Sequence, residues 1–114
     1  MLPPKLTKPQ KAGGRIKSPA HCKWVRSHHC SVPGCKGMPI EAAHVRTGTD
    51  GAMGRKPSDR WVISLCQDHH RQQHAMGEPE FERVHGIDMK EIARAFYRNS
   101  PKFMEIERKA KDES

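Results

Sequence analysis

The stretch Leu65-Cys-Gln-Asp-His-His-Arg-Gln-Gln-His74 decides the fold of this chain. It offers four metal-binding side chains, Cys66, His69, His70 and His74, within ten residues. Neighbouring residues of a helix point about 100° apart, so His69 and His70 face different directions. Cys66 and His69 have the spacing of half a tetrahedral zinc site, whereas His70 and His74 lie one turn apart on a single helix face. The stretch therefore predicts two metal sites, one structural and one working.

The other half of the zinc site is the upstream run Cys30-Ser-Val-Pro-Gly-Cys35. Its Pro-Gly pair predicts a tight turn that brings both thiols to one ion. The resulting Cys3His set for a structural Zn²⁺ is Cys30, Cys35, Cys66 and His69. Cys22 lies outside both pairs, and we expect a free thiol there, although it could replace Cys30 or Cys35 if the pairing differs.

Composition limits the fold to one small domain. The chain has 114 residues, of which 34% are hydrophobic and 5% aromatic. Such a domain cannot hold a deep core and needs additional stabilisation from a bound metal ion or disulfides. The four cysteines are interleaved with eight histidines, so metal is favoured over disulfides. Neither a signal peptide nor an apolar run of membrane-spanning length is present, and we expect a soluble protein of the bacterial cytoplasm.

The excess positive charge of +8 lies entirely in the first 40 residues. Eight lysines and arginines occur there without an acidic residue, and the other 13 basic residues balance the 13 acidic ones. A basic arm of this kind favours nucleic acid as a partner because binding releases counterions. The alternative is a solvated tail that aids solubility. We expect residues 1–19, rich in proline, glycine and lysine, to be a disordered arm, and residues 20–114 to fold.

Between the two halves of the zinc set, the pattern predicts strand, loop, strand and helix. The second strand alternates apolar and polar residues in the period of a half-buried strand. The loop contains glycines and cations and favours a binding role. Capping patterns predict two further helices from about residue 88. The predicted strands are 39–46 and 61–65, the loop is 47–59, and the helices are 21–27, 67–76, 88–98 and one that starts at Ser100-Pro101.

Three motifs resemble those of the HNH endonucleases of phages and prophages: Ala43-His44-Val45-Arg46, Lys56-Pro-Ser-Asp-Arg-Trp61 and Leu65-Cys-x2-His-His-x3-His74. The similarity is greatest to the group that contains the phage recombination enhancement nuclease, and it covers roughly residues 20–100. It implies a small, zinc-stapled α+β fold, a treble-clef-like ββα-metal finger with flanking helices. It also implies metal-dependent cleavage of DNA, with low sequence specificity and a role in phage or prophage recombination or DNA processing.

The resemblance assigns a role to each histidine of the second site. His44, at the end of the first strand, would be the general base, since an imidazole accepts a proton near neutral pH. The alternative is a strand histidine with a structural role. His70 and His74 would hold a catalytic divalent ion, by resemblance Mg²⁺ or Mn²⁺, and two imidazoles also suit Ni²⁺ or Co²⁺.

The sequence departs from the HNH pattern at two positions. Many family members carry an acidic residue or a second histidine just before the general base, where this chain has Ala43. The middle asparagine is absent, and Trp61 occupies its place. Asp59 could compensate, either by binding the metal or by orienting His44. It is equally expected as a turn former.

Several further polar residues have two readings each. The cations near the proposed site are expected to contact phosphate, or else to be solvated charges. His28 and His29 are expected to be a surface pair, with an extension of metal binding as the alternative. His85 is expected to end a helix before Gly86 rather than to be a ligand. The phosphate-contact candidates are Arg46, Arg55, Lys56 and Arg71.

Two functions follow from these patterns. One is an HNH-type DNA endonuclease, with a recombination protein bound to DNA as a partner implied by the resemblance. The other is a zinc-dependent nucleic-acid-binding module without catalysis. A second histidine pair that faces away from the zinc favours the nuclease, whereas Ala43 and Trp61 favour the binding module. A redox function is disfavoured, because the chain has neither Cys-x2-Cys nor a nucleotide-binding glycine motif.

Overall fold

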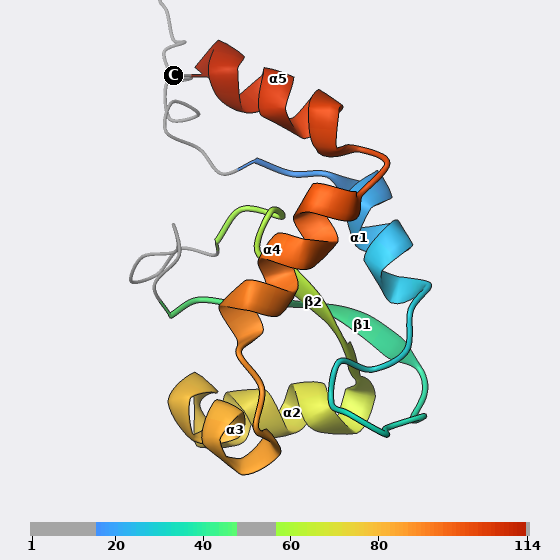
Figure 1. The fold of residues 1–114 in the computed structure, drawn as a ribbon, viewed down its shortest axis with the longest axis vertical. Helices are drawn as coiled ribbons and strands as arrows, with labels where there is room; N and C mark the ends of the chain where they lie inside the picture. Colours follow the sequence, from blue (N-terminus) through green and yellow to red (C-terminus); the bar gives the residue numbers. More distant parts are fainter. Residues whose placement is uncertain (1–15, 48–56, 114) are drawn as a thin grey trace, which may run out of the picture.

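The computed structural model describes residues 16–47 and 57–113 of the chain (Figure 1). Within them, two strands and five helices form a small α+β fold, which confirms the α+β part of the predicted class. Arg55, Lys56 and most of the predicted arm and loop lie outside the described residues. The elements are α1 (Pro19–Arg26), β1 (Ile40–His44), β2 (Val62–Cys66), α2 (Gln67–Met76), α3 (Glu78–His85), α4 (Met89–Asn99) and α5 (Phe103–Glu113).

The two strands pair in antiparallel order and lead directly into α2. Ile40 lies opposite Cys66, and His44 lies opposite Val62. The helix α2 begins at the residue that follows β2, so the strand, strand and helix form one continuous unit. This arrangement places the end of β1, with His44, on the same unit as the histidines of α2.

The second strand is buried on both faces, so the expectation of a half-buried strand is wrong. All five residues of β2 are buried. Ile63 and Leu65 belong to the core cluster with residues of α3 and α4, including Phe81 and Ala93. Ser64 points the other way, where its hydroxyl donates to the His29 carbonyl oxygen at 2.6 Å. The polar position in the alternation is therefore satisfied by the loop after α1 rather than by water.

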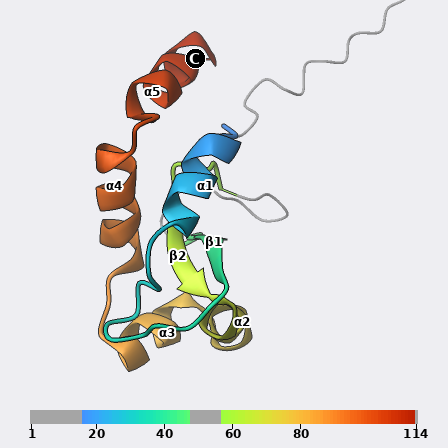
Figure 2. The ribbon, with the colours of Figure 1, turned by 90° about the vertical axis from the view of Figure 1, so that its right-hand side faces the viewer.

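Gly77 separates α2 from α3. It has a φ of 86°, a conformation that residues with a side chain rarely adopt, and it serves as the C-cap of α2 and the N-cap of α3. The helix α3 was not predicted as an element, although His85 and the left-handed Gly86 do end it as expected. Figure 2 shows α2 and α3 together at one end of the sheet and α5 at the other.

The remaining helices cover the sheet. α4 packs against β2, and α1 packs against both strands. As predicted, Asp88 caps α4 by accepting from the Glu91 amide. The last helix begins at Phe103 rather than at Ser100, because Ser100 uses its hydroxyl and carbonyl oxygens to close the preceding turn.

The helix α1 carries a buried polar residue near its start. His21 is fully buried, and its Nδ1 lies 2.8 Å from the Ser100 hydroxyl. Burial lowers the pKa of His21, which favours the neutral ring. His28 is half-buried with its ring against Trp24 and Phe96, so the expected surface pair is wrong for His28 and right for the exposed His29. Trp24 of α1 and Phe96 of α4 explain this burial.

Candidate metal centre and histidine site

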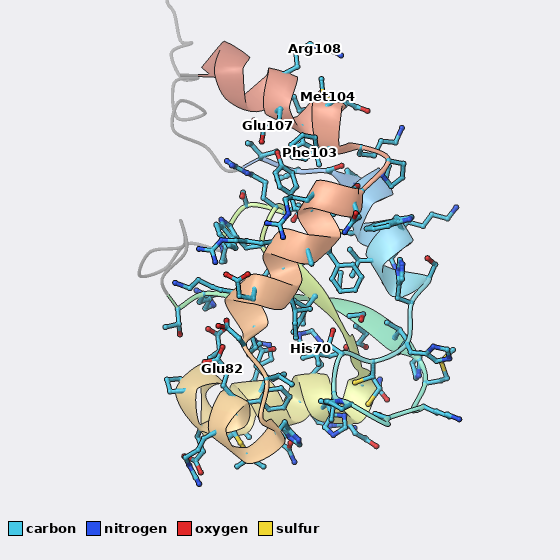
Figure 3. The ribbon with its side chains drawn as sticks, in the orientation of Figure 1. His70, Glu82, Phe103, Met104, Glu107 and Arg108 are labelled. Atoms are coloured by element: carbon cyan, nitrogen blue, oxygen red, sulfur yellow. The ribbon has the colours of Figure 1, made fainter. Side chains whose placement is uncertain are left out.

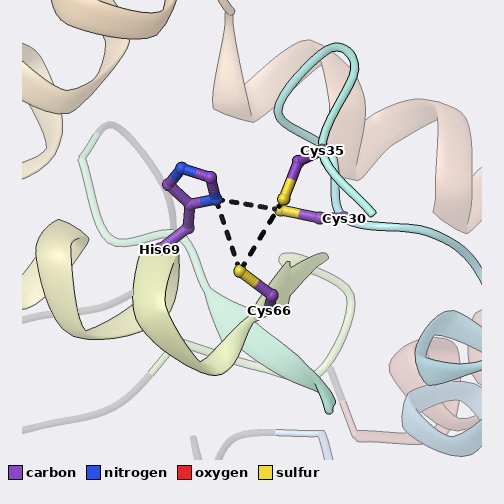
Figure 4. Close-up of side chains that lie close together, drawn as sticks. All are labelled: Cys30, Cys35, Cys66 and His69. Atoms are coloured by element: carbon purple, nitrogen blue, oxygen red, sulfur yellow. Dashed lines mark hydrogen bonds between the residues drawn. The ribbon is translucent and has the colours of Figure 1, made fainter. Parts of the chain in front are cut away.

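Three cysteines and one histidine converge where the loop after α1 meets the junction of β2 and α2 (Figure 4). Their ligand atoms all lie within 4.8 Å of one another. Nδ1 of His69 is 3.4 Å from Sγ of Cys30 and 3.4 Å from Sγ of Cys66, and the thiols of Cys35 and Cys66 are 3.9 Å apart. In a tetrahedral zinc site with bonds of about 2.3 Å, neighbouring sulfurs are about 3.8 Å apart. The cluster could therefore hold a metal ion such as zinc.

Local backbone geometry positions the first two cysteines. The Cys35 amide donates to the Val32 carbonyl oxygen at 3.0 Å, and Gly34 between them has a φ of 79°. These features make the predicted Pro-Gly turn. Gly37 approaches so closely that a Cβ there would lie 3.1 Å from Sγ of Cys66. Cys22 lies on α1 and is not part of the cluster, whose upstream members are Cys30 and Cys35.

The electrostatics of the cluster favour a bound cation. Burial raises the pKa of the Cys30 thiol to about 11. The amide of Gly37 donates to Sγ of Cys35 and lowers the pKa of that thiol. Burial and the nearby His85 lower the pKa of His69, which keeps its ring neutral. A neutral imidazole is the form that binds metal, and a bound cation would stabilise the thiolate form of the buried cysteine.

The adjacent histidines of α2 point to different partners, as the helical geometry predicts. His69 faces the cysteines, whereas His70 lies between α2 and the sheet, where its Nδ1 is 2.7 Å from a carboxylate oxygen of Glu41 (Figure 3). The ring of His74 is 5.0 Å from that of His70, centroid to centroid. Among the described residues, no second group of three or more histidine, cysteine or acidic side chains converges as the Cys3His cluster does.

His44 and Asp59 lie together although nine residues between them fall outside the described parts of the chain. Nε2 of His44 is 2.8 Å from Oδ1 of Asp59. The other carboxylate oxygen accepts from the Ser18 amide at 2.8 Å, and the Asp59 amide donates to the Ile16 carbonyl oxygen at 2.9 Å. The side chain of Asp59 is 10% exposed and that of His44 is 23% exposed. A fixed carboxylate therefore orients a histidine that water can reach.

A pocket of about 240 Å³ opens beside His44. It brings His44 of β1 and His74 of α2 to one surface, together with the predicted phosphate contact Arg46. Of the other candidates, Arg71 is exposed, pairs with Asp68 at 2.8 Å and does not line this pocket. The lining residues are His44, Arg46, Thr47, Gln73, His74, Gly77 and Glu78.

The floor of this pocket is built by Glu78, which the sequence patterns did not single out. Its carboxylate is buried and accepts from the amides of Arg46 and Thr47 at 2.8 and 2.7 Å. It also accepts from Nε2 of Gln73 at 3.0 Å, and the same Nε2 is 3.1 Å from the His44 carbonyl oxygen. The position of Glu78 after Gly77, at the start of a helix, is the only sequence signal of this role.

Glu41 is the second residue that the sequence patterns missed. It lies on β1 three residues before His44, and no spacing rule links it to a histidine 29 residues later. A carboxylate that accepts from Nδ1 of a histidine is a common neighbour of metal-binding imidazoles. The contact could be recognised only when β1 and α2 were placed side by side.

Comparison with known proteins identifies the family. The model of the family described as "Protein of unknown function (DUF968)" matches residues 3–100. The chain belongs to this family. Its sequence is also 33% identical over 75 residues to the "Uncharacterized protein YdfU" of Escherichia coli strain K12. That match spans 65% of this DUF968 chain and 20% of the relative, so the chain corresponds to about a fifth of that protein's length.

No solved structure matched the chain. In the part of the chain that the structure describes, none of the helices combines the length and apolar character needed to cross a membrane.

Proposed function

We propose that this chain is a metal-dependent endonuclease of the HNH type that hydrolyses phosphodiester bonds of DNA. The observation that carries the proposal is the contact between His44 and Asp59 at the edge of a pocket that His74 also lines. In this interpretation β1, β2 and α2 are a treble-clef-like ββα-metal finger, and the Cys3His cluster is its structural zinc site. The proposed role in phage or prophage DNA recombination rests on the resemblance of the motifs alone.

The geometry gives His44 the properties of a general base. With Nε2–H donated to Asp59, the lone pair of Nδ1 can accept a proton from water. Asp59 is a positioning residue, because its second oxygen is held by the Ser18 amide and its contact fixes the ring of His44. Arg46 lines the same pocket and would bind the phosphate whose bond is cleaved.

The chemistry of the remaining donors suits a divalent ion. Glu41 accepts from Nδ1 of His70, which leaves Nε2 of that ring as the metal-binding atom. His74, one turn later, would supply the second imidazole. A bound Mg²⁺, Mn²⁺ or similar ion would stabilise the negative charge that develops on the phosphate. His70 and His74 would hold this ion, while Glu41 would hold His70 in place.

Cleavage of supercoiled plasmid tests the proposal. We expect nicking by the wild-type chain in Mg²⁺ or Mn²⁺ and none in EDTA. The substitution His44→Ala should slow cleavage by about 10²–10⁴-fold, the usual contribution of a general base. His74→Ala should remove the metal-dependent activity. His29→Ala is the matched control, since His29 is exposed and outside the pocket, and equal cutting by all four proteins would refute the assignment.

A second candidate is a zinc-dependent nucleic-acid-binding module without catalysis. The observation in its favour is that, in the described part of the chain, only the Cys3His side chains converge as a group of three or more metal ligands. The plasmid assay separates the two functions. A binding module would retard the plasmid in a gel at low salt and leave it supercoiled in every metal.

A further inference from the structure

A second pocket combines three guanidinium groups with three aromatic rings. It has a volume of about 230 Å³ and lies between the start of β2, α4 and the beginning of α5, where Figure 3 shows Phe103. We call it the arginine pocket. Its lining residues are Arg60, Trp61, Arg94, Tyr97, Arg98 and Phe103.

Cations and rings alternate in the arginine pocket. The guanidinium of Arg60 lies 5.2 Å from the centre of the Tyr97 ring, and that of Arg94 lies 5.7 Å from the centre of the Trp61 ring. The rings of Tyr97 and Phe103 are 4.9 Å apart. Flat rings and flat guanidinium planes are the surfaces on which nucleobases stack, and the same arginines can bind phosphate.

The pocket keeps charge and donors available for a ligand. Two of its arginines have acidic neighbours, since Arg60 is 3.9 Å from Glu107 and Arg94 pairs with Glu91. Arg98 is exposed, and within the described residues no hydrogen bond or ion pair holds its guanidinium. Nε of Arg60 is buried and has no hydrogen-bond partner among them. The donors in the pocket thus exceed the acceptors around it.

A short segment connects the arginine pocket to the proposed catalytic site. Asp59 contacts His44, and the next two residues, Arg60 and Trp61, line the arginine pocket. The Trp61 carbonyl oxygen accepts from the Val45 amide at 2.8 Å, which fixes this segment beside the residue that follows His44. One strand of nucleic acid could therefore contact both places.

We propose that the arginine pocket binds one unpaired nucleotide of a DNA strand, with the base on the aromatic rings and a phosphate on Arg94 and Arg98. The volume suits a single base, since it is smaller than the pockets of about 300–1,000 Å³ that hold drug-sized ligands. The inference rests on the proposed nucleic-acid substrate and adds to it a preference for single-stranded DNA. A free nucleotide has the same chemistry and is the other source that the test must separate.

Binding of a fluorescent oligonucleotide measures the contribution of the arginines. We expect the wild-type chain to bind a single strand more tightly than the matching duplex, and Arg94→Gln/Arg98→Gln to weaken single-strand binding about tenfold. The control is Arg83→Gln/Arg108→Gln, which removes the same charge from exposed positions outside the pocket and should change the affinity less than twofold. Equal losses in the two double variants would overturn the proposal, because they would indicate general charge attraction only.

Tryptophan fluorescence tests stacking without removing the ring. The chain has two tryptophans, so a Trp24→Phe variant reports on Trp61 alone. We expect an oligonucleotide to quench this emission at lower concentrations than a deoxynucleoside monophosphate. Quenching by both at equal concentration would assign the pocket to free nucleotides, and an absence of quenching would overturn the proposal.

Different experimental results would refute the nuclease proposal and the arginine-pocket proposal. His44→Ala tests the nuclease alone, because it should slow cleavage by about 10²–10⁴-fold. A wild-type chain that does not cleave but loses binding through Arg94→Gln/Arg98→Gln would refute the nuclease and retain the arginine pocket. If cleavage requires His44 but single-strand binding does not depend on Arg94 and Arg98, the nuclease would be retained and the arginine pocket refuted.

Discussion

At the scale of single residues, the contact between His44 and Asp59 gives the candidate site its chemistry. An isolated histidine on a strand has no defined tautomer, but a carboxylate held by the Ser18 amide fixes one. The sequence left Asp59 equally suited to a turn and to the site. It lies in a turn, where the Trp61 amide donates to the Ser58 carbonyl oxygen, and its carboxylate also contacts His44. Sequence spacing alone could not decide between the two roles of Asp59, because it does not show whether residue 59 lies beside His44 in space.

Replacing the carboxylate tests its role as a positioning residue. In Asp59→Asn the amide oxygen can still accept from Ser18, while the amide nitrogen would face Nε2 of His44 and favour the wrong tautomer. We expect kcat for plasmid or oligonucleotide cleavage to fall by about 10²–10⁴-fold with KM nearly unchanged. Glu80→Gln is the control, because that carboxylate pairs with Arg83 on α3 and does not line the pocket. A parallel rise in KM would point to a structural role instead.

At the scale of elements, the features that were predicted correctly from the sequence are those that local signals determine. The helix α2 has the predicted bounds, since Cys66, His69 and Gly77 mark it, and α4 starts at its predicted cap. The burial of β2 on both faces was missed because it depends on α4 and on the loop after α1, which are far away in sequence. The helix α3 was also missed because of a contact between distant residues, since its Glu78 accepts hydrogen bonds from amides that follow β1.

Glu78 should therefore hold the end of β1 against α3. In Glu78→Gln one acceptor oxygen becomes an NH2 group that cannot accept from the amides of Arg46 or Thr47. We expect a loss of about 2 kcal/mol in the free energy of unfolding, the usual value for hydrogen bonds to a charged group. Urea unfolding would measure it, and hydrogen exchange should show faster exchange at those two amides. Glu80→Gln, an exposed pair with Arg83 on the same helix, should leave both measurements unchanged.

At the scale of the whole molecule, the Cys3His cluster brings together residues from three parts of the chain. It links the loop after α1, the end of β2 and the first turn of α2, at the edge of the core cluster. In a chain of 114 residues with 34% hydrophobic content, a metal ion bound here would replace part of the apolar core that a larger domain would have. The four side chains of the cluster could be predicted from the sequence because metal geometry restricts the spacing of ligands along the chain. The arginine pocket could not, because its residues come from three elements and no spacing rule links them.

Removal of the metal should consequently unfold the chain rather than open one loop. We expect about one zinc ion per chain in the purified protein and a cooperative loss of helical circular dichroism when a strong chelator removes it. Cys35→Ser should lower both the zinc content and Tm, because it removes one of four ligands and leaves the buried Cys30 without a nearby thiolate partner in the turn. Cys22→Ser is the matched control, since Cys22 lies outside the cluster and should retain full zinc content. If Cys35→Ser kept the zinc and the wild-type Tm, the cluster would not be the metal site, and the fold would have to be stabilised by its apolar contacts alone.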